Sequence, residues 1–245
     1  MAFADLLLGA LAVLLATSLG ALSVVLFRRL GKGFYPAMLA FSAGVMAYSS
    51  VEMIGAAHSS SGDAATALGF LVGLLALYIM EKGIPHAHHF LRRKEMAAST
   101  KKAALIAGAI SLHNVPEGLA VAAAFASSTP LGWLVTASIA LQDVPEGLLV
   151  SAPLALYGVR LRRCLEFGIL SGAVEAGAAV AGYFLFSFAA PVVPFGLSFS
   201  AGAMAFVVLV ELLPDAMKNG RERAAALSFA LGIAAAFGMA TLFAL

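Results

Sequence analysis

Eight apolar stretches, each long enough to cross a lipid bilayer, occupy most of this 245-residue chain. A membrane-spanning helix needs about 20 consecutive, mostly apolar residues. The qualifying stretches are residues 4–27, 36–57, 63–83, 102–126, 132–157, 163–187, 194–217 and 223–245. Only 11% of the residues are charged, against about a quarter in soluble domains. We therefore expect an all-α integral membrane protein with eight transmembrane helices, forming a single transmembrane domain over residues 1–245.

The basic residues predict how these spans are threaded. All 15 Lys and Arg residues lie in or beside the first, third, fifth and seventh connections, and none lies in the other connections or the tails. Basic residues accumulate in cytoplasmic loops, so both termini are expected outside. The third connection, at about residues 84–101, is then cytoplasmic and contains His86, His88 and His89. Metal binding and incidental placement both remain open for these histidines.

Two short sequences occur twice and indicate an inverted repeat. Residues 41–47 read FSAGVMA and residues 199–205 read FSAGAMA, in the second and seventh spans. VPEGL occurs at 115–119 and 144–148, in the fourth and fifth spans. Within each pair the spans run antiparallel in the predicted threading. The pattern predicts a 3+2+3 inverted-repeat arrangement, which in transporters places the binding site near the membrane midplane.

The motifs HNVPEG at 113–118 and QDVPEG at 142–147 place polar groups inside the fourth and fifth spans. His113 and Glu117 are four residues apart, and Asp143 and Glu146 are three apart, so each pair shares a helix face. No Lys or Arg lies at this depth. Ionisable groups inside a bilayer mark functional sites, and unpaired carboxylates there require a cation or a proton.

Imidazole combined with carboxylates suits Zn, Fe and Mn. Glu175 of the sixth span can add a carboxylate and Met46 of the second a thioether, although packing is the ordinary role of such a methionine. A hydrogen-bonded helix-packing network is the alternative to a metal site. The candidate metal ligands are His113, Asn114, Glu117, Gln142, Asp143, Glu146, Glu175 and Met46.

These paired hexapeptides, the eight spans and the His-bearing third connection resemble the ZIP (Zrt/Irt-like) family of divalent-metal transporters. The Gln142–Asp143 pair is similar to the GufA-like bacterial subgroup. The resemblance implies that Zn²⁺, or Cd²⁺, Fe²⁺ or Mn²⁺, is moved into the cytoplasm by alternating access, spans 1, 4, 5 and 6 moving against 2, 3, 7 and 8. It implies a multi-pass location in the bacterial inner membrane.

The resemblance also implies a binuclear site with two bound ions at the midplane, bridged by two glutamates. The first metal position would be formed by His113, Glu117, Glu146 and Met46. The second would be formed by Asn114, Glu117, Asp143, Glu146 and Glu175. Gln142 stands where many family members have histidine, which leaves the metal preference open.

Two other functions compete with transport. One is a membrane metal-binding sensor, and the other is a di-metal membrane enzyme. The sequence has neither the Glu-x-x-His pairs of di-iron bundles nor an HExxH motif, so we expect no enzyme and no catalytic cofactor. It also has no ATP-binding GxxxxGK[ST] motif and no cytoplasmic segment long enough to bind nucleic acid. The expected partners are metal ions and the bilayer, with a homodimer left open.

Overall fold

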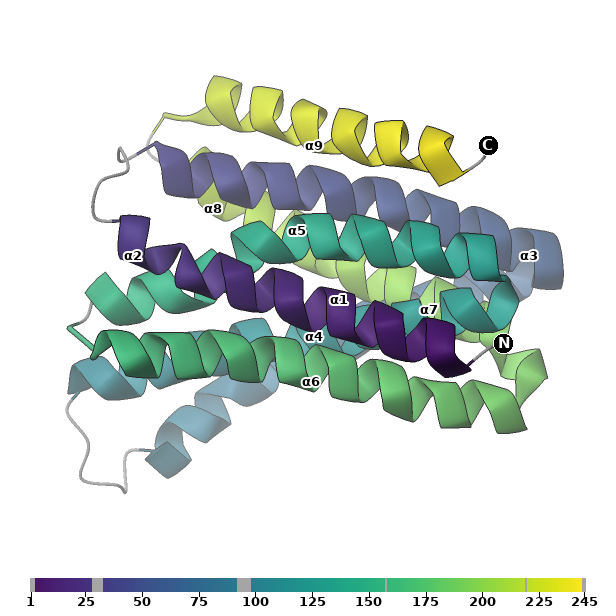
Figure 1. The fold of residues 1–245 in the computed structure, drawn as a ribbon, viewed down its shortest axis with the longest axis horizontal. Helices are drawn as coiled ribbons and strands as arrows, with labels where there is room; N and C mark the ends of the chain where they lie inside the picture. The colour runs from purple at the N-terminus through teal and green to yellow at the C-terminus, as the bar shows by residue number, and fades with distance from the viewer. Residues whose placement is uncertain (1–2, 28–32, 92–97, 157, 219, 244–245) are drawn as a thin grey trace.

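Helices form the whole secondary structure of the residues that the computed structural model describes (Figure 1). These residues are 3–27, 33–91, 98–156, 158–218 and 220–243, with backbone alone for 26–27, 83–91, 98–112 and 243. The elements are α1 (Phe3–Leu22), α2 (Val24–Phe27), α3 (Phe34–Leu91), α4 (Ala98–Ser127), α5 (Thr129–Leu156), α6 (Leu161–Phe188), η1 (Ala190–Val192), α7 (Val193–Phe206), η2 (Val207–Leu212), α8 (Leu213–Met217) and α9 (Glu222–Phe243).

Helix α3 consists of two legs that meet at Gly62. Gly62 has φ 76° and ψ 179°, a backbone conformation that glycine adopts without strain because it lacks a Cβ. The break falls inside the sequence SSSGD, where the second and third spans were expected to be separated. The first leg packs against α5 and α9, and the second against α7. The helix continues to Leu91, beyond the predicted end at 83 and into the predicted loop.

Six helical segments of the described chain are long and apolar enough to cross a membrane. They are Phe3–Leu22, Phe34–Lys82, Thr129–Leu156, Leu161–Phe188, Ala190–Met217 and Glu222–Leu242. The prediction of an all-α membrane protein is confirmed, whereas the count of eight spans stays a prediction.

The two termini lie at one end of the bundle (Figure 1). The end of α2, the junction of α5 with α6 and the junction of α8 with α9 lie at the opposite end. Arg160 directly precedes α6, Arg162 and Arg163 lie in its first turn, and Lys218 directly follows α8. Arg28, Arg29, Lys32, Arg92, Arg93 and Lys94 lie outside the described residues. The arrangement agrees with the predicted clustering of basic connections at one end.

Two pairs of helices cross through the same four-residue pattern, Phe-x-x-Gly. In the crossing of α3 with α9, a Cβ on Gly44 would strike the Phe229 carbonyl oxygen and one on Gly232 would strike that of Phe41. In the crossing of α3 with α7, Gly73 meets the Phe199 carbonyl in the same way and Gly202 meets that of Phe70. Such small residues allow membrane helices to approach closely.

The VPEG motifs make a second set of matched crossings. Gly147 of α5 packs on the Thr17 carbonyl of α1, and Gly20 of α1 packs on the Val144 carbonyl of α5. In the same way, Gly118 of α4 packs on the Glu175 carbonyl of α6. The crossing of α1 with α5 therefore corresponds to that of α6 with α4.

The helices accordingly group into two bundles. The most extensive contacts join α1, α4, α5 and α6 to one another, which we call the first bundle, and join α3 to α7 and α9. We call α3, α7, η2, α8 and α9 the second bundle. Between the bundles, α4 lies against α7 and α5 against α3. We call the α3–α5 contact the seam.

Candidate metal centre

Helices α4 and α5 carry the two hexapeptides into the interior of the protein. Both run without a break through Pro116 and Pro145, although proline has no N–H for the helical hydrogen bond. Glu117 and Glu146 directly follow these prolines and are almost completely buried. The glycines that come next, Gly118 and Gly147, hold α4 against α6 and α5 against α1. The glutamates are thus fixed beside the crossings of α4 with α6 and of α5 with α1.

Three carboxylates form the centre of the site. One oxygen from each of Glu117, Asp143 and Glu146 lies within 4.8 Å of the corresponding oxygens of the other two. All three side chains are buried. Carboxylate oxygens at this separation can share a cation, because each can supply a ligand atom to one central ion.

Two hydrogen bonds orient the glutamates. Gln142 Nε2 donates to Glu117 Oε1 at 2.6 Å, and Ser42 Oγ of α3 donates to Glu146 Oε1 at 3.0 Å. Each bond uses one oxygen and leaves Oε2 of the same glutamate without a partner. Gln142 therefore positions Glu117. The sequence predicted Gln142 only as a metal ligand and did not predict this role. Ser42 was not among the predicted site residues.

Helix α6 adds Glu175 to the same interior. Both Glu175 oxygens are buried and have no hydrogen-bond partner, and the carboxylate interacts electrostatically with Asp143 and Glu117. Asn114 donates through Nδ2 to the Ser171 carbonyl at 3.3 Å and to Ser171 Oγ at 3.2 Å. This leaves Asn114 Oδ1 buried and unpartnered, which makes it available as a further oxygen ligand.

The buried oxygens of the site have few hydrogen-bond donors to satisfy them. Oxygens of Asn114, Glu117, Asp143, Glu146 and Glu175 have no hydrogen-bond partner. The Thr17 hydroxyl lies near Asp143 but donates to its own helix, at the Val13 carbonyl. The Lys and Arg ion pairs found among the described residues, Arg162–Glu166 and Lys218–Asp215, involve exposed or half-exposed side chains. Buried charge needs pairing or metal coordination, so this arrangement fits a bound cation.

His113 lies on the same helix face as Glu117 but points to a different partner. Its Nδ1 is 3.8 Å from Glu211 Oε2, and it is not part of the group formed by Glu117, Asp143 and Glu146. Glu211 is held by the π-helix η2 (Val207–Leu212) and is 31% exposed. Single π-helical turns often occur at functional sites. The sequence VVLVEL gave no sign of this turn, so the contact could not be anticipated.

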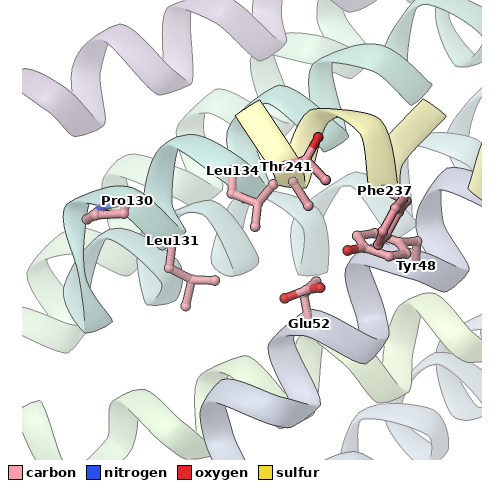
Figure 2. Close-up of a pocket in the computed structure, with 8 residues that line it drawn as sticks. Tyr48, Glu52, Pro130, Leu131, Leu134, Phe237 and Thr241 are labelled. Carbon is pink, nitrogen blue, oxygen red and sulfur yellow. The ribbon is translucent and has the colours of Figure 1, made fainter. Parts of the chain in front are cut away.

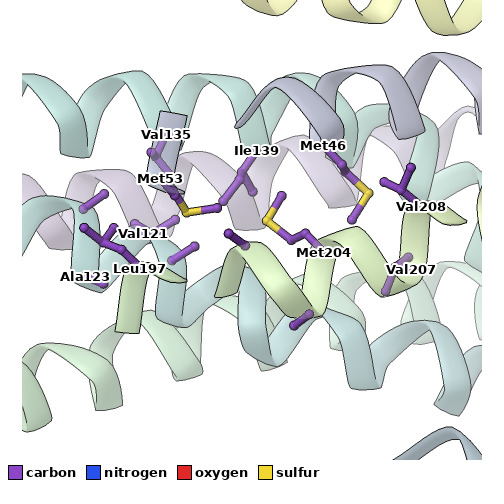
Figure 3. Packing of buried hydrophobic residues seen from close by; sticks show 14 of the residues in the cluster. Met46, Met53, Val121, Ala123, Val135, Ile139, Leu197, Met204, Val207 and Val208 are labelled. Atoms are coloured by element: carbon purple, nitrogen blue, oxygen red, sulfur yellow. The ribbon is translucent and has the colours of Figure 1, made fainter. Parts of the chain in front are cut away.

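Met46 lies one helical turn beyond Ser42 on α3 and is completely buried. It belongs to the apolar cluster that also contains Met53, Ile139 and Met204 (Figure 3). Residues four apart share a helix face, so Met46 lies on the side of α3 that faces Glu146. This position suits both packing and metal ligation.

A cavity of about 370 Å³ lies farther along the seam, toward the end of the bundle that holds the termini (Figure 2). Tyr48 and Glu52 of α3, Leu131 and Leu134 of α5, and Phe237 of α9 contribute to its lining. Glu52 is ten residues from Ser42, or about 15 Å along the helix. The buried side chains of Met53, Val135 and Ile139 fill the interior in this part of the protein. At the same end, His58 Nδ1 is 3.1 Å from Asp63 Oδ1, and both side chains are exposed.

Comparison with known proteins places this chain among metal transporters. A family model described as ZIP Zinc transporter matches residues 91–245. Zinc transporter ZupT of Corynebacterium glutamicum is 34% identical over 250 residues, covering 90% of this chain and 92% of that protein. Zinc transporter GufA of Myxococcus xanthus is 37% identical over 162 residues, covering 65% of this chain and 63% of that protein. Zinc transporter ZIP11 of Homo sapiens is 42% identical over 142 residues, which is 55% of this chain and 42% of that protein.

Proposed function

Because the chain belongs to the ZIP family, we propose that it carries divalent transition metal ions, zinc foremost, across the membrane. Membership makes it a multi-pass membrane protein and a transporter rather than an enzyme. The names of its relatives, zinc transporters in three organisms, support zinc as the principal substrate. Cd²⁺, Fe²⁺ and Mn²⁺ are further substrates that the ligand types would accept.

The observation that carries this proposal is the buried group of Glu117, Asp143 and Glu146, with oxygens that no protein donor satisfies. A structural hydrogen-bond network would leave few such oxygens, because unsatisfied buried polar groups are costly. A centre that must bind and then release an ion needs ligands of this kind. The donor set is rich in oxygen and, among the described residues, has no thiolate in the group.

We propose that two ions can occupy the centre, bridged by Glu117 and Glu146. The free Oε2 atoms of both glutamates support bridging. Asp143, Glu175 and Asn114 would complete one position, and His113 with Met46 the other. Gln142 would hold Glu117 through Nε2 in the metal-free state. His113 would bind the metal through Nε2, while Nδ1, 3.8 Å from Glu211 Oε2, could keep the carboxylate as its partner, as metal-bound imidazoles commonly do.

The proposed topology has eight spans with both termini outside and a cytoplasmic third loop. The 49 residues from Phe34 to Lys82 would measure about 74 Å as one helix, more than twice the bilayer core of about 30 Å. The break at Gly62 supports two spans in this segment. Helix α4, with 30 residues, supplies the remaining span although its polar motif lowers its mean hydropathy.

An inverted 3+2+3 repeat is supported by the matched glycine crossings. The α3–α9 crossing pairs the second span with the eighth, and the α3–α7 crossing pairs the third with the seventh. Exchange of the two repeats converts one crossing into the other. It also converts the α1–α5 crossing into the α6–α4 crossing. We propose alternating access in which the first bundle moves relative to the second along the seam.

The metal would pass from the cavity beside Glu52 to the centre and leave past Glu211. The cavity lies at the end of the seam nearest the two termini, and Glu211 is partly exposed beyond His113.

The proposed direction is into the cytoplasm, and the proposed location is the bacterial inner membrane. The side chains of His86, His88 and His89 lie outside the described residues, so their part in metal release stays a prediction. Homodimer formation also stays a prediction.

The decisive experiment is uptake of radioactive zinc into proteoliposomes containing wild type or Glu117→Ala, with Cd²⁺, Mn²⁺ and Fe²⁺ as competitors. We expect saturable uptake by the wild type and none above empty liposomes by the variant. Equilibrium zinc binding is measured on the same preparations. Saturable binding without flux in the wild type would contradict transport and favour the sensor, whereas unchanged flux in Glu117→Ala would contradict the proposed site.

A further inference from the structure

Ser42 makes a direct link between the second bundle and the metal centre of the first. Its hydroxyl donates to Glu146 Oε1 at 3.0 Å and also lies 3.4 Å from the Gln142 carbonyl oxygen. Ser42 is completely buried. The other hydrogen bond to these glutamates, from Gln142 to Glu117, stays within the first bundle. The carboxylate of Glu146 is therefore held from across the seam.

This bond depends on the relative position of the two bundles. Ser42 is carried by α3, which is fixed to α9 and α7 through the Phe-x-x-Gly crossings. Glu146 is carried by α5, and the following Gly147 is fixed to α1. Hydrogen bonds weaken steeply as distance and angle depart from their optimum. A relative displacement of the bundles by more than about 1 Å along the seam would break the bond.

We propose that Ser42 is a positioning residue: its hydrogen bond to Glu146 stabilises the present arrangement of the two bundles and sets the orientation of Glu146 in it. The proposal rests on the proposed function, because it assumes that the bundles move. In this arrangement Oε1 is held by Ser42 and Oε2 is free for the metal. In the displaced arrangement Glu146 lacks this donor. Ser42 thus makes the two arrangements unequal in energy and in metal affinity, which a ligand-driven shift requires.

The helix α3 supplies a matched control in Ser49. Its side chain is also buried, but its hydroxyl donates to the Val45 carbonyl of its own helix at 3.1 Å. Ser42→Ala and Ser49→Ala remove the same atom from the same helix, and only the first removes the link to Glu146. Ser42→Thr retains a hydroxyl and tests whether the hydrogen bond itself is responsible.

The test measures distances between spin labels on the two bundles by double electron–electron resonance. Labels are attached at Leu170→Cys of α6 and Leu231→Cys of α9, both exposed positions. Cys164, the single native cysteine, is replaced by serine. Spectra are recorded for reconstituted protein with and without zinc. Zinc flux is measured on the same proteins, to give kcat and KM separately.

We expect Ser42→Ala to lower the population of the present arrangement, relative to the displaced one, by about tenfold. This is the effect of losing one hydrogen bond to a charged group. It should raise KM and change kcat, while Ser42→Thr restores both and Ser49→Ala resembles the wild type. Identical distance distributions and kinetics for Ser42→Ala and Ser49→Ala would overturn the proposal. A single distribution under every condition would overturn it as well. Absence of zinc flux in all proteins would instead refute transport.

Discussion

Gly118 offers a quantitative test of the idea that close helix crossings set the geometry of the metal centre. It follows Glu117 in α4, and a Cβ at this position would lie 2.1 Å from the Glu175 carbonyl oxygen. Real Cβ atoms essentially never approach closer than 3.0 Å. In Gly118→Ala, α4 and α6 must therefore separate by at least 0.9 Å, the difference between these two distances. The obstacle is backbone, which cannot rotate away as a side chain can.

The separation moves Glu117 away from Glu175. Binding groups need placement within about 0.5 Å, and disturbed supporting contacts typically lower metal affinity by about 10- to 100-fold. Overpacking of this kind also destabilises a protein by about 1–3 kcal/mol. We therefore expect Gly118→Ala to bind zinc about 10- to 100-fold more weakly, with a lower melting temperature in detergent.

Gly177→Ala is the matched control. Gly177 lies in α6, two residues after Glu175, and a Cβ there would meet nothing within 4 Å. Replacing a helical glycine by alanine in open space stabilises the helix by about 0.5–1 kcal/mol. Isothermal titration with zinc and thermal unfolding monitored by size-exclusion chromatography measure both quantities. Equal zinc affinities and melting temperatures for the two variants would refute the reasoning.

The remaining predictions concern the ligands, the pH and the second bundle. Glu146→Gln should abolish zinc flux while leaving a folded protein, as measured in proteoliposomes and by chromatography. Carboxylates must be ionised to bind metal, so acidifying the zinc-containing side should slow initial uptake, and faster uptake would contradict the assignment. Gln142→His supplies an imidazole, so in competition assays the preference for zinc over manganese should rise several-fold. Gly44→Ala should lower the melting temperature, because its Cβ would strike the Phe229 carbonyl, whereas Gly55→Ala, in open space, should not.

Much of the fold could be predicted because hydrophobicity and basic residues act over whole segments. The break between the second and third spans was predicted from SSSGD, and the structure places it at Gly62. The second and seventh spans were matched because FSAGVMA and FSAGAMA share six of seven residues. Their crossing partners were not found. FLVG at 70–73 and FALG at 229–232 share only Phe and Gly, and both patterns are common in apolar helices.

The site could be predicted only in part because spacing places residues on a helix face but not against another helix. The i, i+3 spacing of Asp143 and Glu146 predicted that they share a helix face, and the structure brings both together with Glu117. The same kind of argument placed His113 with Glu117, yet His113 contacts Glu211 across the bundle boundary. Ser42 escaped notice because one serine in an apolar helix resembles many others. Its importance arises only when the seam brings α3 against α5.

The distribution of close contacts bears on how the transporter can move. Within each bundle, glycine crossings bring backbones together so tightly that a single methyl group would clash. Such crossings resist sliding, because packed interiors change between discrete arrangements rather than deform continuously. Across the seam, by contrast, the contact at the metal centre is a serine hydroxyl on a carboxylate, which can be broken and remade. Relative motion of the bundles would therefore leave the glycine crossings within each bundle intact and would act on the surface that carries the proposed metal ligands. If the bundles slide there, every cycle must break the Ser42–Glu146 hydrogen bond, which links metal binding to the motion.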